Sequence, residues 1–291
     1  MGFRALVRYT GYMHTRATPT SFIARRRTLL PIGSLLGAAL LLGGCGAFDD
    51  VPRGTNSLLE VLNPQTSPTE AAEMATDPYS AENRYKGITL LSSADFGGLP
   101  VYLELYTDGL NDDDASVRGA AVRAIGHHGD PEHAPLIIEA LQDEDDFVRL
   151  EAARGMQRIH SIDAVDSLLK LIDENNESNM DIRAACANAL GQYREKRVVL
   201  GLMGALGDSR LGVNNRVQHA LMILTGQNFG IDRNAWFDWY NGTIDIFAGA
   251  QPYTYPVFNR KKKIIEYMPF VPPPPNETPG TPVGMDPVID D

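Results

Sequence analysis

Small and apolar residues recur at steps of three and four positions in three stretches of the chain that resemble one another. Each stretch begins with a β-branched residue followed by arginine, and then runs through alanine or another small residue to a longer apolar side chain. This spacing is typical of one face of an α-helix, and the small residues allow a neighbouring helix to approach closely. We therefore predict three related helices, which begin near Val117, Val148 and Ile182.

A second apolar stretch follows each of these helices, and a similar one precedes the first. We predict second helices over 101–110, 135–141, 164–172 and 198–206. Gly126 and Gly191 fall where a first helix should stop, since glycine is common just after a helix C-terminus. Each second helix is followed by acidic residues, at 112–114, 143–146, 173–174 and 208.

The arginines near the start of the first helices give the period of the pattern. The intervals are 34, 31, 34 and 33 residues between Arg84, Arg118, Arg149, Arg183 and Arg216. Such a period is the signature of a helical solenoid, in which a unit buries its apolar face only against its neighbours. We therefore predict an all-α fold, an α-α superhelix of four to five repeats over 78–227.

These units resemble HEAT repeats, in particular the short HEAT-like repeats first described in phycobilisome lyases. The resemblance is carried by the Val-Arg-x-x-Ala-x-x-Ala core that starts at Val117, by the Gly-Asp-Pro-Glu of 129–132 and by the Leu-x-Asp turns. It covers about half of the chain. It implies the fold and almost nothing about activity, because one fold hosts many functions.

The resemblance also implies a structural ladder, since the turn aspartate and the helix arginine stack between repeats in that family. Here it implies contacts that pair Asp112, Asp143 and Asp173 with Arg118, Arg149 and Arg183. Arg84 and Arg216 hold the corresponding places in the first and last copies. The last copy departs from the pattern, because Asn215-Arg216-Val217 replaces Val-Arg and leaves the register open by one residue.

Two segments flank the repeats. Residues 45–77 are predicted to form a tether and short N-terminal capping helices, with Ser67 as an N-cap, Pro68 at the first helical position and Glu70 at the capping-box site. Residues 228–271 contain a crowded aromatic group that includes Trp236 and Trp239. We predict that this group covers the open end of the solenoid; the alternative is a ligand-binding aromatic patch.

The remaining C-terminal sequence is irregular. Residues 253–257 and 264–268 could form two short strands or extended segments, and 260–263 are the dense basic cluster of the chain. The cluster suits a solvated turn, with anionic lipid head groups, an acidic partner or the acidic turns of this chain as alternatives. Residues 272–291 are rich in proline and acidic, which predicts a disordered or extended polyproline tail.

Residues 1–44 resemble a bacterial lipoprotein signal peptide. Arginines precede the apolar run 29–42, which is too short for a good transmembrane helix and ends in Leu42-Gly43-Gly44-Cys45. This ending resembles the lipobox, and the resemblance implies that Cys45 carries the lipid. Arg26 and Arg27 leave both the general and the twin-arginine export routes open. Gly46 lacks the aspartate that marks inner-membrane retention in some bacteria, which favours the outer membrane.

Charge limits the choice of partner. The whole chain has 26 basic and 37 acidic residues; the first 44 contain six arginines and no acid, so the remainder carries 20 − 37 = −17. Such an acidic protein is a poor general binder of nucleic acid, whose phosphates need cations. We expect instead an unidentified protein partner with a basic surface, and binding that weakens with salt.

Candidate chemistry is sparse. His127, His128 and His133 form a metal-like cluster in one loop, but the spacing is not a closed zinc pattern and no cysteine assists. No phosphate-binding, dinucleotide or nucleophile-elbow motif is present. We therefore expect no enzyme activity and no cofactor. The prediction is a lipid-anchored, periplasm-facing scaffold or adaptor that docks a partner along its second helices. The alternative is an envelope enzyme or metal or ligand binder that uses the histidine loop or the aromatic patch.

Overall fold

The computed structural model describes residues 66–257, 259, 261–269, 271 and 276–285, and Gln65–Asp291 form one compact unit. The predicted signal peptide, Cys45 and all of the tether except its last helix lie outside the described residues. Within the described part there are eleven α-helices and no regular strand. None of these helices has the length and apolar content needed to cross a membrane.

The helices follow one another along the chain with short connections. They are α3 (Pro68–Ala75), α4 (Ala81–Ser92), α5 (Pro100–Gly109), α6 (Ala115–His128), α7 (Ala134–Ala140), α8 (Asp146–Gly155), α9 (Val165–Leu171), α10 (Met180–Leu190), α11 (Lys196–Ala205), α12 (Leu211–Thr225) and α13 (Arg233–Gly242). Short 3₁₀ turns η1 (Pro131–His133), η2 (Ile162–Ala164) and η3 (Ile264–Tyr267) complete the regular structure.

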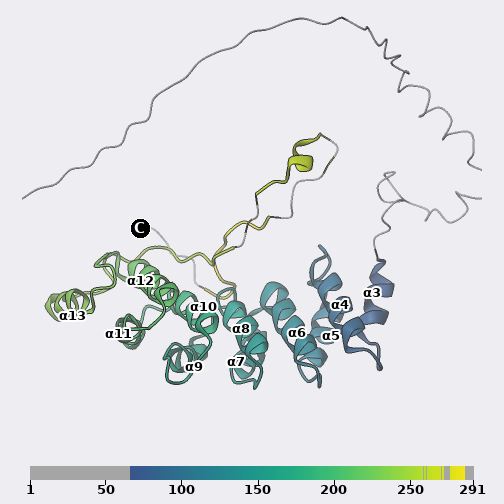
Figure 1. Cartoon of the computed structure of the whole chain (residues 1–291), viewed down its shortest axis with the longest axis horizontal. Helices are drawn as coiled ribbons and strands as arrows, with labels where there is room; N and C mark the ends of the chain where they lie inside the picture. The colour runs from purple at the N-terminus through teal and green to yellow at the C-terminus, as the bar shows by residue number, and fades with distance from the viewer. Residues whose placement is uncertain (1–65, 258, 260, 270, 272–275, 286–291) are drawn as a thin grey trace, which may run out of the picture. The chain divides into compact units, whose positions relative to one another are not determined.

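The helices form two rows (Figure 1). The first helices α4, α6, α8, α10 and α12 pack side by side in one row, and α5, α7, α9, α11 and α13 form the other. Each of α5, α7, α9 and α11 also packs against the first helix of the next unit. This arrangement confirms the predicted all-α superhelix, because each unit depends on its neighbour to bury its apolar face.

Local sequence accounts for where the helices begin. The four predicted second helices lie within two residues of α5, α7, α9 and α11. The first helices start at capping side chains: Asp114, Asp145 and Asn179 each accept a hydrogen bond from the backbone N–H two residues ahead. Such caps satisfy donors that the first helical turn leaves unpaired. Ser67 caps α3 in the predicted way, accepting from the Glu70 N–H at 3.1 Å.

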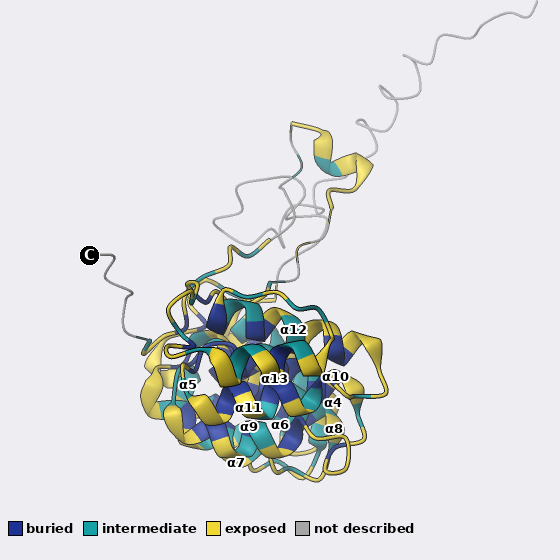
Figure 2. Cartoon of the chain, turned by 90° about the vertical axis from the view of Figure 1, so that its left-hand side faces the viewer, coloured by how far each residue is buried: buried dark blue, intermediate teal, exposed yellow. Residues whose placement is uncertain are grey.

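One continuous apolar core runs between the two rows (Figure 2). At its C-terminal end Trp236 of α13 is fully buried, its ring centroid lies 5.0 Å from that of Phe229, and its indole N–H donates to the Gly230 carbonyl. Phe237, on the other side of α13, is exposed. These side chains therefore lie where a cap on the last repeat requires them.

Gly126 differs from the prediction. It does not end the first helix, since α6 continues to His128. A Cβ atom at position 126 would stand 2.7 Å from the Cα of Gly155 in α8, closer than real Cβ contacts. The glycine is thus required by the close approach of two helices and not by a helix stop. Gly191 does follow directly on α10, as predicted.

In the C-terminal region, residues 251–257 form no strand, which leaves the extended alternative for 253–257. Ile264–Tyr267 differ from both alternatives and form the 3₁₀ turn η3. The described part of the tail, 276–285, contacts the helical body. Val283 pairs with Ile159 in an isolated parallel bridge: its N–H donates to the Arg158 carbonyl at 2.7 Å and its carbonyl accepts from His160 at 2.8 Å.

Side chains add to this contact of the tail. Arg158 forms a bidentate ion pair with Glu277, and its guanidinium lies 4.6 Å from the centre of the Tyr255 ring. The Tyr255 N–H in turn donates to the Gly280 carbonyl. Proline-rich composition argued for disorder, but an arginine fork and open backbone groups at the end of α8 give these residues a binding surface.

The Gly126–Gly155 contact can be tested by adding one methyl group. We expect Gly126→Ala to lower the free energy of unfolding by about 1–3 kcal/mol, because the new Cβ meets backbone that cannot rotate away. The matched control is Gly204→Ala in α11, where a Cβ would have no neighbour within 4 Å; it should raise helix stability by up to about 1 kcal/mol. Denaturant unfolding followed by circular dichroism measures both, and equal effects would contradict the close approach.

Candidate interaction surface

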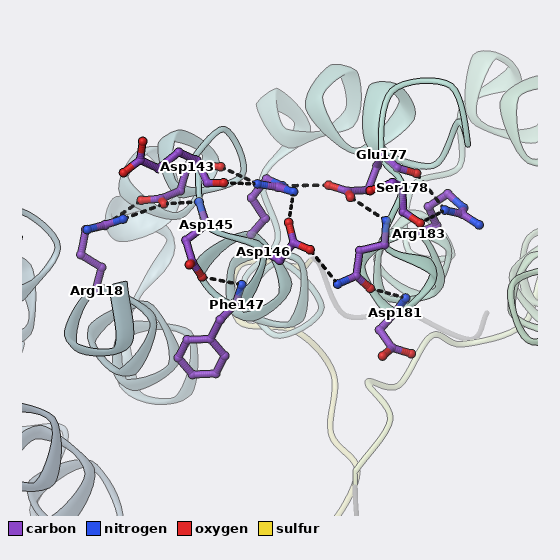
Figure 3. A network of polar contacts seen from close by, with 12 residues as sticks. Arg118, Asp143, Asp145, Asp146, Phe147, Glu177, Ser178, Asp181 and Arg183 are labelled. Atoms are coloured by element: carbon purple, nitrogen blue, oxygen red, sulfur yellow. Dashed lines mark hydrogen bonds and ion pairs between the residues drawn. The ribbon is translucent and has the colours of Figure 1, made fainter. Parts of the chain in front are cut away.

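Arginines at the start of the first helices bridge successive repeats (Figure 3). In α6, Arg118 donates from Nε and Nη2 to the two carboxylate oxygens of Asp143 at 2.8 and 2.9 Å. Its Nη1 donates to the Asp112 carbonyl in its own preceding turn, at 2.9 Å. One guanidinium therefore joins the turn before its own helix to the turn of the next unit.

The same contact recurs along the array. Arg84 pairs with Asp112 at 2.6 and 2.7 Å, Arg149 with Glu177 at 2.8 Å, and Arg183 with Asp208 at 2.6 and 3.1 Å. Each of these carboxylates also accepts a backbone N–H two residues ahead, which shapes the turn. We call this series the ladder. Its arginines are occupied by structural partners and are not free to bind another protein.

The structure differs from the expected ladder in three respects. The carboxylates of Asp112 and Asp143 pair with the arginine of the preceding repeat, and Arg118 and Arg149 reach these two residues only through their main-chain carbonyls. The third acid is Glu177, and Asp173 makes no contact with Arg183. In the last copy the ladder position is Asn214, whose side-chain N–H donates to the Asp208 carbonyl at 2.9 Å. Arg216 lies one half-turn further along α12 and makes no ion pair with any described residue.

A buried carboxylate outside the ladder was not foreseen. Glu151 in α8 is only 2% exposed and accepts from Arg123 at 2.9 Å and from Arg154 at 2.7 Å. The Arg123 guanidinium also stands 5.4 Å from the centre of the Phe147 ring. Two cations offset the cost of burying one carboxylate. The Arg123–Glu151 pair thus links α6 to α8 in the next repeat, as the ladder pairs do.

The pKa values of three ladder carboxylates are shifted. Burial alone would raise the pKa of Asp112, Asp143 and Asp208, but the hydrogen bonds from the paired arginine and from a backbone N–H, together with nearby arginine charges, outweigh burial. The pKa of each is therefore lower than in an unfolded chain. These groups stay ionised, which keeps the bridges intact.

A groove separates α9 from α11 in the second row. It has a volume of about 430 Å³ and its walls include Leu169, Gly201, Gly204, Asp173 and Glu174. At Gly204 a Cβ atom would meet nothing within 4 Å, so the wall is open there. Among the described residues, the Asp173 carboxylate accepts only from the backbone and side-chain N–H of Asn175, and the Glu174 carboxylate accepts from the Ser209 N–H. Neither carboxylate makes an ion pair with a described residue.

A neighbouring groove between α7 and α9 has a volume of about 590 Å³. Its polar wall is different, since it contains the ladder pair Arg149 and Glu177 and the cation Lys170. The side chain of Asp166 at its rim is ion-paired with Arg197. The charges of this groove are therefore largely balanced. The α9–α11 groove also contains a cation, Arg233, but neither Asp173 nor Glu174 makes an ion pair with it or with any other described residue.

The three predicted histidines do not form one cluster: the rings of His127 and His128 pack with their centroids 4.5 Å apart, but His133 turns to its own backbone. His128 Nε2 lies 2.7 Å from the Ser92 carbonyl, His133 contacts the backbone of Asp130, and His127 lies 3.9 Å from Glu277. Burial, followed by the charges of His128 and Arg158, lowers the pKa of His127. Among the described residues there is no group of three histidine, cysteine or acidic side chains that could hold a metal ion.

Comparison with known proteins supports the repeat assignment. A family model of HEAT repeats matches residues 103–179, from within α5 to the residue before α10. This part of the chain is therefore similar to HEAT repeats. The match confirms a helical repeat scaffold of the kind that supports protein interaction, and it spans both the Asp143 and the Glu177 turns of the ladder.

Solved structures give two similar folds. A chain of the CpcE–CpcF complex of phycocyanin lyase from Nostoc sp. PCC7120 is 19% identical with a TM-score of 0.41, and the alignment covers 53% of this chain and 96% of that one. YibA of E. coli is 18% identical with a TM-score of 0.45, and the shares are 69% and 77%. No curated protein matches the sequence.

Breaking the most buried bridge should be costly. Arg183 and Asp208 are 3% and 2% exposed, so Arg183→Met leaves a carboxylate without its cation. We expect the free energy of unfolding to fall by about 3–5 kcal/mol. The control is Arg197→Met, which removes an exposed ion pair with Asp166 and should change stability little. Urea unfolding of both variants measures the difference; similar small losses would show that the ladder does not hold the repeats together.

Acid should weaken the protein through the same carboxylates. Because the folded pKa values of Asp112, Asp143 and Asp208 are lowered, the unfolded chain binds more protons in the acidic range. Their contribution is complete above the unfolded aspartate pKa of about 3.9 and is lost as the pH falls through the folded values. Urea unfolding at a series of pH values should show this decline below about pH 4. A stability that stays level there would contradict the shifts.

Proposed function

We propose that this protein is a lipid-anchored scaffold of the bacterial cell envelope that docks a basic protein segment in the groove between α9 and α11. The proposal gives the chain no catalytic role and no cofactor. It is supported by the repeat architecture, which offers a row of second helices with open grooves, and by the resemblance of residues 1–45 to an export and lipidation signal.

One observation carries the choice of groove. Asp173 and Glu174 stand on its wall without an ion pair to any described residue, while the ladder acids next to them are all held by arginines or backbone. A lysine or arginine of a partner would therefore form an ion pair with a carboxylate that no described cation of the fold occupies. Gly201 and Gly204 keep side chains out of the groove, so that a partner segment can reach Leu169.

The anchor sets where such docking would take place. A lipid at Cys45 would hold the solenoid at the membrane through the segment 46–65, and Gly46 favours the outer membrane, facing the periplasm. The net charge of −17 without residues 1–44 should speed the encounter with a basic partner and make it sensitive to salt.

Site-specific crosslinking in intact cells tests the groove. A photoreactive residue placed at Ala205, on the wall of the groove, should crosslink a partner. Asp173→Asn combined with Glu174→Gln should reduce that product by roughly tenfold, since each interfacial charge pair contributes on the order of 1 kcal/mol or more. The matched control is Glu132→Gln with Asp163→Asn. It removes two exposed carboxylates in the 3₁₀ turns that precede α7 and α9, at the opposite ends of these helices from Asp173 and Glu174. Mass spectrometry of the purified chain should show a lipid on Cys45, which Cys45→Ser should remove.

The outcomes separate the parts of the proposal. Equal crosslinking in the double variant and its control would exclude the carboxylates as the docking site. Crosslinking that is retained while the purified chain carries no lipid on Cys45 would exclude the lipid anchor but keep the groove. No product from Ala205 in any form would overturn the scaffold function of this surface.

A further inference from the structure

The turn at 261–268, which we call the basic turn, displays apolar side chains that the rest of the described chain leaves uncovered. Ile264 is 92% exposed, Ile265 59%, Tyr267 74% and Met268 57%. None of the residues of η3 is buried, and Figure 2 draws the turn almost entirely in the colour of exposed residues. Four large apolar side chains in five consecutive positions form an exposed patch that is unusual for a soluble surface.

The backbone of the basic turn is closed by its own hydrogen bonds. The Lys263 N–H donates to the Glu266 side chain at 2.7 Å, and the Glu266 N–H donates to the Lys263 carbonyl at 2.9 Å. The Met268 N–H donates to the Ile265 carbonyl at 3.1 Å. The turn is thus preformed, because three of its main-chain N–H groups are paired within it.

Charge distinguishes the basic turn from the rest of the molecule. Lys261, Lys262 and Lys263 directly precede the apolar side chains, in a chain whose net charge is −11. The Lys262 ammonium lies 5.9 Å from the centre of the Tyr267 ring, so cationic and apolar groups share one small surface. Lysines beside exposed aliphatic and aromatic side chains are the combination that binds the interface of an anionic bilayer.

A bilayer fits this surface better than an acidic protein does. A narrow turn offers little area for the flat, closely packed contact that a protein partner needs. A bilayer needs no matching pocket, because side chains on a turn can enter the boundary between head groups and acyl chains while lysines remain at the phosphates.

We propose that the basic turn inserts Ile264, Ile265 and Tyr267 into the surface of an anionic phospholipid bilayer, with Lys262 and Lys263 on the lipid phosphates. This surface is separate from the α9–α11 groove and does not require a lipid at Cys45. It adds a second contact with the membrane to the anchored scaffold proposed above, and it would orient the solenoid on the bilayer.

A local fluorescent reporter tests the insertion in the full-length chain. The parent carries Cys45→Ser, and the remaining Cys186 is fully buried, so that Ile265→Cys supplies the accessible thiol for an environment-sensitive dye. With vesicles of phosphatidylcholine and phosphatidylglycerol, the dye emission should shift to the blue and be quenched by a lipid-borne quencher. With phosphatidylcholine alone it should not. The same dye at Ile244→Cys, a fully exposed isoleucine after α13, is the control and should not respond.

Charge removal completes the test. Lys262→Gln with Lys263→Gln should raise the vesicle concentration needed for half of the shift by roughly tenfold or more, because each lysine near an anionic surface adds on the order of 1 kcal/mol. A dye at 265 that responds no more than the dye at 244 would overturn the proposal. A response to vesicles without anionic lipid, or to protein concentration without vesicles, would also overturn it, the latter in favour of contact between copies.

These results stand apart from the crosslinking at Ala205. All variants carry Cys45→Ser and an intact groove, so failure of the lipid anchor or of partner docking leaves the dye response unchanged. Failure of the basic turn likewise leaves the Ala205 product intact.

Discussion

A fork of arginine nitrogens that reaches from one repeat to the next holds the array in register. Each guanidinium donates to the carboxylate in the turn of the next repeat and to a main-chain carbonyl in the turn before its own helix. That carboxylate also accepts a backbone N–H within its own turn and so shapes the turn. Such bidentate contacts define orientation as well as distance. With Gly126 against Gly155, they bring the first helices close together and make this row the rigid side of the molecule.

The two rows consequently have different physical characters. Small residues and buried ion pairs close the first row, whereas the shorter second helices leave grooves between them, one of which is lined by Gly201 and Gly204 of α11. A rigid row fixes the positions of Asp173 and Glu174 without taking part in binding. This division explains why a scaffold can use many acidic residues for its own architecture and still retain a few for a partner.

Much of this architecture was predictable from periodicity. The second helices lay within two residues of expectation because their apolar faces repeat at helical spacing. Glu177 and Asn214 were not predicted, because the expected ladder used only the aspartates that directly follow the second helices. The six-residue spacing from Asp112 to Arg118 would have indicated both. The contact of 276–285 with Arg158 could not be predicted from the sequence. Proline-rich composition describes local backbone preference and carries no information about a cation distant in the chain.

That contact gives the molecule a property that an ideal repeat array lacks. In a solenoid of nearest-neighbour contacts, a pull on the C-terminus would peel off the last unit first. Here Glu277 is tied to Arg158, 119 residues earlier, and Val283 is paired beside it. Tension applied beyond residue 285 would therefore reach the end of α8 directly and pass by α10, α12 and α13. The terminal helices are shielded from load, and the middle of the array becomes its mechanical attachment point.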